Sequence, residues 1–389
     1  MVLGALICQM GLGYGYVFGA LQDPVRLDLG WTRTEYSTAV AARLPINALA
    51  LSAVGFLTLR IGARGVLTGA CFLGAATFLA LGRMNSLWQL YALIPFVGII
   101  LGSFGDVAVG HVVTRWVQRG RGTALGLVYV GSNLAGMTLV PLVAWIARRA
   151  SWRLAFSWVG VGLAAFILPW AAFAVRDPRP GEGAPDAEES EAGAANDLNL
   201  ARALWTRSFW LLGFNLFATF FYLVSMIDQI VSILADAGMP HSDAAATFGT
   251  IVGMGLFGKL AMGPIADRIP APRAMQLNTA LLAFSSLLLF QLPAPGPLWL
   301  FVASFGFAYT ARDVLYPVIV VHCFGVRYLA EIYGVLMLTL LAGMLGSIAA
   351  AASRDYWGSY DAAFALYAAL NLLSLLAVWF LRDERRRSA

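Results

Sequence analysis

The chain has 389 residues, of which 60% are hydrophobic and only 12% are charged, and its mean hydropathy is +0.74. Soluble domains hold about 25% charged residues, so this composition excludes a soluble enzyme or a soluble binding module. The net charge of +5 does not indicate a nucleic-acid partner, because the arginines gather in short segments between apolar runs.

Apolar runs of about 20 residues follow one another along the chain, and each is long enough to cross a hydrocarbon layer of ~30 Å. Lipid cannot satisfy an open sheet edge, so the runs predict an all-α integral membrane protein of about twelve transmembrane helices. In chain order we expect spans at 2–21, 37–58, 66–82, 87–110, 123–145, 154–175, 208–234, 243–265, 274–292, 297–322, 331–351 and 362–381.

The basic residues are unevenly divided between the two sets of alternating loops. The set that includes the C-terminal tail holds 16 arginines, and the other set holds seven. Because cytoplasmic loops carry the excess of Lys and Arg, we expect a multi-pass protein of the cell inner membrane with both termini in the cytoplasm.

An internal repeat appears when the chain is shifted against itself by 208 positions. Tyr14 then meets Tyr222, Gly30 meets Gly238, and Ser151-Trp-Arg meets Ser359-Tyr-Asp. A repeat in one direction predicts two pseudo-symmetric six-helix bundles related by an axis along the membrane normal. We expect an N-terminal bundle over 1–176, an acidic cytoplasmic linker over 177–207, and a C-terminal bundle with a short basic tail over 208–389.

Charged side chains at membrane depth point to function. Each costs roughly 2.5–3.5 kcal/mol at a helix centre that faces lipid, so such residues pair with one another or line a wet cavity. Six fall inside the expected spans: Arg43, Asp106, Asp228, Lys259, Arg312 and Asp313.

Lys259 is the single lysine among 26 basic residues. An ammonium can release a proton, which a guanidinium cannot do, so this position favours either a substrate anion site or an ion pair with an acid on another helix. Neighbours on a helix point about 100° apart, so we expect Arg312 and Asp313 to face different surfaces. A carboxylate in an apolar bundle holds a proton readily, which makes Asp313, and also Asp228, candidates for proton coupling.

Two matched loops carry a family resemblance. Gly263-Pro-Ile-Ala-Asp-Arg268 resembles the signature loop after the eighth span of the major facilitator superfamily, and the segment from Gly55 to Arg64 resembles its counterpart after the second span, with Leu59 where the family has Asp. The segment Arg115-Trp-Val-Gln-Arg-Gly-Arg-Gly-Thr-Ala-Leu-Gly126 resembles the monocarboxylate transporter and oxalate–formate antiporter branch.

The resemblance implies two six-helix bundles that rock about a central site and move organic acid anions, often with a proton. In the resembling branch an Arg that binds the substrate carboxylate stands at the position of Lys259. We therefore expect substrate binding by Lys259, Arg312, Tyr14, Tyr222, Tyr129 and Asn133, although packing explains the tyrosines equally well. We expect gating by Arg43, Asp228, Asp106, Arg60, Arg64, Asp267 and Arg268, although Arg43 and Asp228 also suit a permanent bridge.

The sequence thus predicts a secondary active transporter of a small organic carboxylate, driven by proton symport or anion exchange. The expected partners are the acid anion, a proton or counter-anion, and the bilayer. We expect the protein to work as a monomer, with no metal or cofactor. One alternative is a proton-driven drug or metabolite exporter of the same fold, which would need an acid-lined cavity. A polytopic membrane enzyme is a further alternative that would need clustered His, Asp or Glu, and the chain shows no such cluster.

Overall fold

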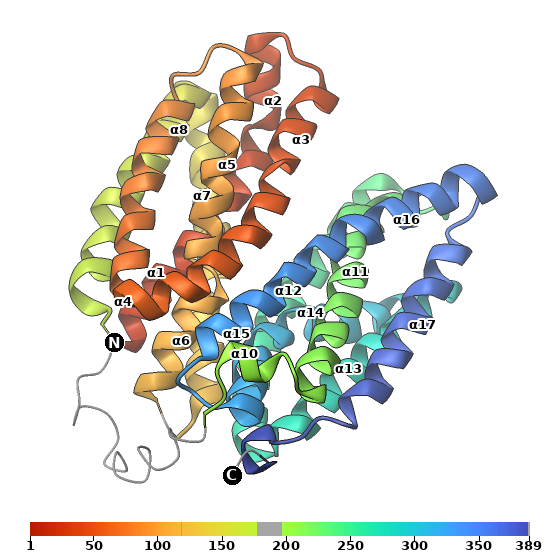
Figure 1. The fold of residues 1–389 in the computed structure, drawn as a ribbon. Helices are drawn as coiled ribbons and strands as arrows, with labels where there is room; N and C mark the ends of the chain where they lie inside the picture. The colour runs from red at the N-terminus through yellow and green to blue at the C-terminus, as the bar shows by residue number, and fades with distance from the viewer. Residues whose placement is uncertain (118, 177–196, 388–389) are drawn as a thin grey trace. The chain divides into compact units, whose positions relative to one another are not determined.

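The computed structural model describes residues 1–117, 119–176 and 197–387, and every regular element within these ranges is a helix (Figure 1). Most of the expected linker, residues 177–196, lies outside the described residues. The described part of the linker forms the short helix α10, Leu200–Ala203, and Asp197 accepts a hydrogen bond from the backbone N–H of Arg327 at 2.9 Å.

The expected membrane helices are present. Ten helices of the described chain are long and apolar enough to cross a membrane. One of them, Glu35–Leu81, contains two expected spans, which are separated where Gly62 leaves the helical conformation (φ 75°, ψ 158°). The remaining expected span is helix α14, Pro295–Phe324, whose apolar sequence is interrupted by Arg312 and Asp313. These helices confirm the predicted all-α membrane fold.

The described chain divides into two compact units. Of the described residues, unit 1 comprises 1–117, 127–176 and Tyr333–Val335, and unit 2 comprises Arg119–Gly126, 197–332 and 336–387. The first turn of helix α7 therefore belongs to unit 2, and the rest of that helix belongs to unit 1.

The α-helices of the first half are α1 (Val2–Gln9), α2 (Val17–Leu29), α3 (Arg33–Ala41), α4 (Arg43–Leu81), α5 (Leu87–Ser103), α6 (Asp106–Trp116), α7 (Arg121–Arg149) and α8 (Trp152–Gly162). Those of the second half, besides α10 and α14, are α11 (Arg207–Asp236), α12 (His241–Arg268), α13 (Ala271–Leu288), α15 (Leu329–Leu336), α16 (Ala342–Trp357) and α17 (Asp361–Val378). A 3₁₀ segment, Met10–Tyr16, joins α1 to α2, and two π segments, Leu163–Ile167 and Trp170–Ala174, continue α8.

The duplication appears in the ends of the first span of each unit. Gly30 (φ 70°) ends α2, and Gly238 (φ 96°), its partner at the offset of 208, follows α11. Both are left-handed, a conformation that glycine adopts without steric cost, so the chain leaves the first helix of each half in the same way.

A second pair of equivalent contacts closes each unit on itself. In unit 1 the indole of Trp152 donates to Asp28 at 2.9 Å, and in unit 2 the hydroxyl of Tyr360 donates to Asp236 at 3.0 Å. Asp28 and Asp236 are 208 positions apart, as are Trp152 and Tyr360. The same joint, between the end of the first span and the start of the last, thus recurs in both halves and confirms their pseudo-symmetry.

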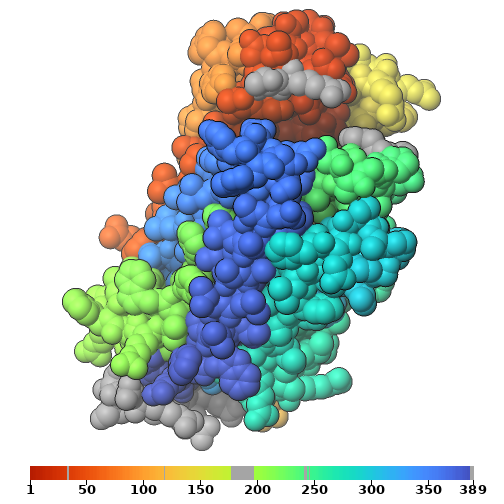
Figure 2. Space-filling view, turned by 90° about the vertical axis from the view of Figure 1, so that its right-hand side faces the viewer, coloured from red at the N-terminus to blue at the C-terminus, as the bar shows by residue number. Residues whose placement is uncertain are grey.

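Aromatic side chains fill the interior of unit 2. The ring of Tyr222 packs edge-on against Phe305 at 5.2 Å between centroids, and Phe305 stacks on Phe301 at 5.2 Å. Lipid is as apolar as these rings, so close packing rather than exclusion from water holds such a bundle together. On the face of unit 2 shown in Figure 2, α17 (blue) lies beside α13 (teal).

Candidate functional site

Helices α12 and α14 approach each other closely in unit 2 because small residues line their contact. A methyl group at Gly258 would overlap the backbone carbonyl oxygen of Phe307. One turn earlier, the hydroxyl of Thr310 donates a hydrogen bond to the carbonyl of Gly255 across the same contact. Close helix approach of this kind brings side chains that follow the small residues within reach of the facing helix.

Lys259, directly after Gly258, forms a buried charged cluster with two residues of α14. Its Nζ lies 3.2 Å from Oδ2 of Asp313, and an Nη atom of Arg312 lies 2.9 Å from Oδ1 of the same carboxylate. The three side chains are 5%, 13% and 12% exposed for Lys259, Arg312 and Asp313. Two cations share one carboxylate here, so the three side chains carry a net charge of +1 when all are ionised.

Arg312 and Asp313 contact different helices, α11 and α12, but their charged groups also contact each other, which was not expected. Their Cα–Cβ bonds diverge as helix geometry requires. The guanidinium, however, sits at the end of a long flexible stem, so it reaches back to the neighbouring carboxylate. The same guanidinium lies over the ring of Phe220, 4.5 Å from its centroid, which adds a cation–π contact from α11.

A buried polar network fixes the rotation of α14 one turn after the cluster. The hydroxyl of Tyr316 donates to the side-chain oxygen of Asn215 on α11. The amide nitrogen of Asn215 donates to Thr279 on α13 at 3.1 Å and to Ser374 on α17 at 2.6 Å. Sequence analysis did not identify this network, although polar residues isolated within apolar spans were a signal that could have revealed it.

The remaining predicted residues of α11 have partners within unit 2. The hydroxyl of Tyr222 is fully buried and hydrogen-bonded to Ser285 at 3.0 Å. Asp228 is exposed and accepts a hydrogen bond from Ser347 at 2.8 Å. Both contacts suit packing, and the substrate role of Tyr222 and the coupling and gating roles of Asp228 stay predictions.

The segment Gly263–Arg268, expected as a loop, forms the last turns of α12 and holds the start of α7. The carboxylate of Asp267 accepts the backbone N–H groups of Gly122 at 2.7 Å and Thr123 at 2.8 Å, as well as the Thr123 hydroxyl at 2.6 Å. An acid is favourable there, because the first N–H groups of a helix lack partners within the helix. Arg268 beside it is exposed.

The counterpart loop in unit 1 lacks this acid. Leu59 stands at the position equivalent to Asp267, and a leucine cannot accept hydrogen bonds from a helix start. Arg60 and Arg64 are exposed, and Nε of Arg64 donates to the carbonyl of Val175 at 2.9 Å. The gating roles of Arg60, Arg64, Asp267 and Arg268 stay predictions.

Asp106 occupies the first turn of α6, where its charge complements the helix dipole. Its carboxylate accepts a hydrogen bond from Gln9 at 3.0 Å, and its carbonyl accepts one from the hydroxyl of Tyr129 at 3.0 Å. Arg115 is in the last turn of the same helix. Asp106 and Tyr129 therefore contribute to one joint between α1, α6 and α7.

Three further predicted residues belong to different elements of unit 1. Tyr14 is buried against Phe78, with 6.2 Å between ring centroids. Asn133 is half-buried on α7, and Arg43 is half-buried with its guanidinium 5.6 Å from the ring centroid of Phe18. Their binding and gating roles stay predictions.

Metal-ligating side chains do not gather anywhere in the described chain: no group of three His, Cys, Asp or Glu residues is placed to hold a metal ion. The three cysteines Cys8, Cys71 and Cys323 are buried as free thiols.

The chain forms two helical units that repeat one pattern and contain apolar helices of membrane length. A charged cluster is buried inside one of them. These features define a polytopic membrane transport protein. A family model described as Major Facilitator Superfamily matches residues 3–347, and the chain belongs to that superfamily. The protein is therefore a transporter and not an enzyme.

Several curated proteins resemble the chain at low identity. An uncharacterized MFS-type transporter, YcxA of Bacillus subtilis, is 26% identical over 66% of this chain, which spans 63% of that protein. Monocarboxylate transporter 13 of Bos taurus is 26% identical over 81% of this chain and 73% of its own length. The Agnestins efflux protein AgnL12 of Paecilomyces divaricatus is 26% identical over 55% of this chain and 47% of its own length.

Solved structures show the same fold. The Escherichia coli fucose:proton symporter FucP matches with a TM-score of 0.74 at 13% identity, over 98% of each chain. The human organic anion transporter MFSD10 matches with a TM-score of 0.70 at 17% identity, over 97% of each chain. At these identities the similarity extends to the fold alone.

Proposed function

We propose that the protein is a secondary active transporter that moves a small organic carboxylate by alternating access, coupled to proton symport or anion exchange. One observation carries this proposal: Lys259 and Arg312 share the single carboxylate of Asp313 inside unit 2. A second carboxylate, brought by the substrate, would balance the cluster at two positive and two negative charges. The similarity to the bovine relative, which is named as a monocarboxylate transporter, supports this class of substrate.

Asp313 links anion binding to proton binding. While ionised it occupies both cations, and a substrate carboxylate must compete with it. A proton on Asp313 removes that competition, so Lys259 becomes available to the substrate and each bound ligand favours the other. If Asp313 instead stays ionised through the cycle, the site favours replacement of one anion by another, which is exchange.

Of the two cations, Lys259 is better suited than Arg312 to contact the substrate first. An ammonium makes single, rotatable hydrogen bonds, whereas a guanidinium makes a rigid two-point contact. Arg312, held over Phe220 and against Asp313, is the more constrained of the two cations. We therefore assign the first contact with the acid to Lys259 and the secondary contact to Arg312.

An exporter of drugs or metabolites is the second candidate, and the similarity to AgnL12, which is named as an efflux protein, favours it. The two cations of the cluster favour an anionic cargo in either case. The direction of transport and the size of the cargo distinguish the two functions.

We propose that the protein lies in the inner membrane with both termini in the cytoplasm, and that it functions as a monomer. The excess of arginine in the loops on the side of the C-terminal tail supports this orientation, as 16 of these residues lie there against seven on the other side.

Transport into vesicles tests the proposal. Purified protein in proteoliposomes is given labelled monocarboxylates or dicarboxylates, with an inward proton gradient, with no gradient, or after preloading with unlabelled acid. We expect uptake of at least one carboxylate, stimulated by the proton gradient for symport or by preloading for exchange. Transport of neutral or cationic drugs, with no carboxylate moved in any arm, would contradict the proposal.

A further inference from the structure

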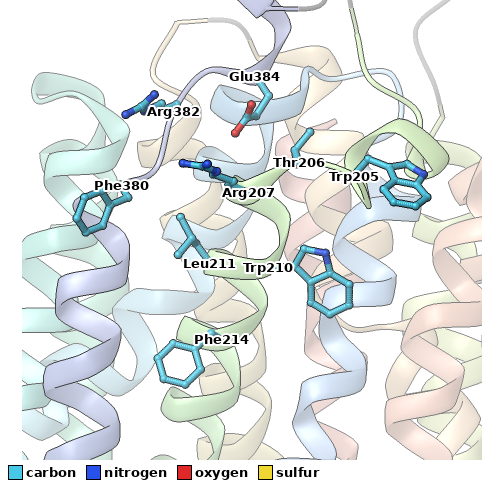
Figure 3. A pocket seen from close by; sticks show the side chains of 9 residues that line it. All are labelled: Trp205, Thr206, Arg207, Trp210, Leu211, Phe214, Phe380, Arg382 and Glu384. Atoms are coloured by element: carbon cyan, nitrogen blue, oxygen red, sulfur yellow. The ribbon is translucent and has the colours of Figure 1, made fainter.

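A groove of 540 Å³ lies in unit 2 where α11 begins and α17 ends (Figure 3). Its volume falls within the roughly 300–1,000 Å³ that small-molecule sites occupy. Arg207 and Arg382 supply positive charge on one part of its wall, and the rings of Trp210, Phe214 and Phe380 line the part that continues along the helices. The arginine end also holds the carboxylate of Glu384 and the ring of Trp205, and it carries a net positive charge because two guanidinium groups stand against one carboxylate.

The groove stands at the level where apolar helix meets water. The membrane-length stretch of α11 begins at Arg207, and that of α17 ends at Val378. Aromatic residues favour this interfacial level, and Trp210 and Phe380 are 65% and 63% exposed there. The aromatic part therefore faces the acyl region, and the arginines face the headgroup region.

The chain after α17 is tied to the start of α11, which brings the two arginines together. The backbone N–H of Arg382 donates to the hydroxyl of Ser208 at 3.3 Å, and the Ser208 backbone N–H donates to the carboxylate of Glu384 at 3.3 Å. Glu384 is 8% exposed and also accepts the Ser208 hydroxyl, so its charge is directed to the helix start. Figure 2 shows the start of α11 (light green) beside the end of α17 (blue).

Both guanidinium groups are exposed, and neither forms an ion pair with any side chain in the described part of the chain. Two guanidinium groups on one wall of the groove suit the oxygens of a phosphate diester, because arginine binds phosphate through paired hydrogen bonds. Basic pockets between transmembrane helices that open to the headgroup layer bind anionic lipid headgroups in this way.

We propose that this groove binds one anionic phospholipid. Its headgroup phosphate lies between Arg207 and Arg382, and an acyl chain follows Trp210, Phe214 and Phe380 along the helices. The net negative charge of a phosphatidylglycerol headgroup matches the two arginines, whereas the choline of phosphatidylcholine cancels the charge of its own phosphate. The occupant is therefore an anionic lipid rather than any lipid.

Lipid-dependent thermal stability tests the proposal. The full chain is purified in detergent, delipidated and titrated with phosphatidylglycerol, with phosphatidylcholine or with inorganic phosphate. The test variant is Arg207→Gln with Arg382→Gln. The matched control is Arg202→Gln with Arg273→Gln, which removes the same charge from two exposed arginines outside the groove.

We expect phosphatidylglycerol to raise the melting temperature of the wild type and the control at the same lipid concentration. The groove variant should require about thirtyfold more lipid, since each basic residue near an anionic lipid surface contributes about a fivefold change in binding. The single variants Arg207→Gln and Arg382→Gln should each show an intermediate shift. Equal responses of the groove variant and the control, or equal stabilisation by phosphatidylcholine or inorganic phosphate, would overturn the proposal.

Discussion

At the scale of single residues, Asp313 has more influence on the charged cluster than either cation. Removing Lys259 leaves Arg312 and Asp313 as a balanced pair, whereas removing Asp313 leaves two buried cations against each other. An uncompensated buried charge costs about 3–5 kcal/mol, so the carboxylate stabilises the empty transporter as well as coupling it.

Asp313→Asn mimics the protonated carboxylate permanently. We expect its uptake of the acid to lose stimulation by a proton gradient, while exchange of internal for external acid continues, because both cations remain open to the substrate. Uptake in vesicles with and without a gradient measures this. Asp243→Asn, in the exposed first turn of the same α12 that carries Lys259, is the control and should keep the wild-type response. A wild-type gradient response in Asp313→Asn would exclude Asp313 as the proton carrier.

The sequence singled out the members of this cluster but not their geometry. Lys259 was conspicuous as the single lysine, and Arg312 and Asp313 as charges within an apolar run. Their mutual contact depends on how the long arginine side chain bends, which helix periodicity does not specify. The supporting hydrogen bonds of Asn215 depend on which faces of four helices meet, and one sequence contains no direct record of that.

At the scale of elements, the contact between α12 and α14 positions Lys259 opposite Asp313. Gly258→Ala places a methyl group against the carbonyl of Phe307, so we expect the helices to separate and both stability and uptake to fall. Overpacking of this kind typically costs about 1–3 kcal/mol. Gly253→Ala is the matched control on the same helix, because beyond its own turn of backbone no atom of the described chain lies within 4 Å of the added methyl group.

Thermal unfolding in detergent compares the two glycine variants. The control should melt at or slightly above the wild-type temperature, since alanine is the better helix former. A Gly258→Ala protein as stable as the control would show that α12 and α14 do not depend on this close contact.

Element positions were the most predictable part of the fold. Membrane-length apolar runs leave few alternatives to helices, and the expected spans are all present. The merging of two spans around Gly62 and the 3₁₀ and π segments were not predicted, because they arise from local backbone adjustments that hydropathy does not report.

At the scale of the whole molecule, the duplication gives each half the same closing contact. The repeat was readable from aligned positions such as Tyr14 and Tyr222. Sequence alone did not reveal that Asp28 accepts a hydrogen bond from Trp152, or that the equivalent Asp236 accepts one from Tyr360. The identity of the substrate could not be predicted from the repeat, since it depends on the shape of a cavity.

The orientation of the chain yields a labelling test. Arg83→Cys and Arg202→Cys introduce one exposed thiol each, and the three native cysteines are buried, so background labelling is low. With a membrane-impermeant maleimide on intact cells, we expect Arg83→Cys to react and Arg202→Cys to react only after permeabilisation. Labelling of Arg202→Cys in intact cells would reverse the proposed topology.

The proposed function depends most on Lys259 as the residue that holds the acid. Charge-assisted hydrogen bonds are worth about 1.5–3 kcal/mol, which is roughly ten- to a hundredfold in affinity. Lys259→Gln should lower binding and uptake of the carboxylate by that factor yet fold normally, because Arg312 and Asp313 remain paired. Lys259→Arg should keep part of the uptake, since it restores the charge.

The decisive experiment measures two quantities: uptake of labelled carboxylate, and the rise in melting temperature that the carboxylate induces. Both are compared for the wild type, Lys259→Gln, Lys259→Arg and the double variant Lys259→Gln with Asp313→Asn. We predict that Lys259→Gln loses uptake and ligand-induced stabilisation while its melting temperature without ligand stays near that of the wild type. Wild-type uptake by Lys259→Gln, or a loss of stability that Asp313→Asn restores, would instead identify Lys259 as half of a structural ion pair and contradict the account.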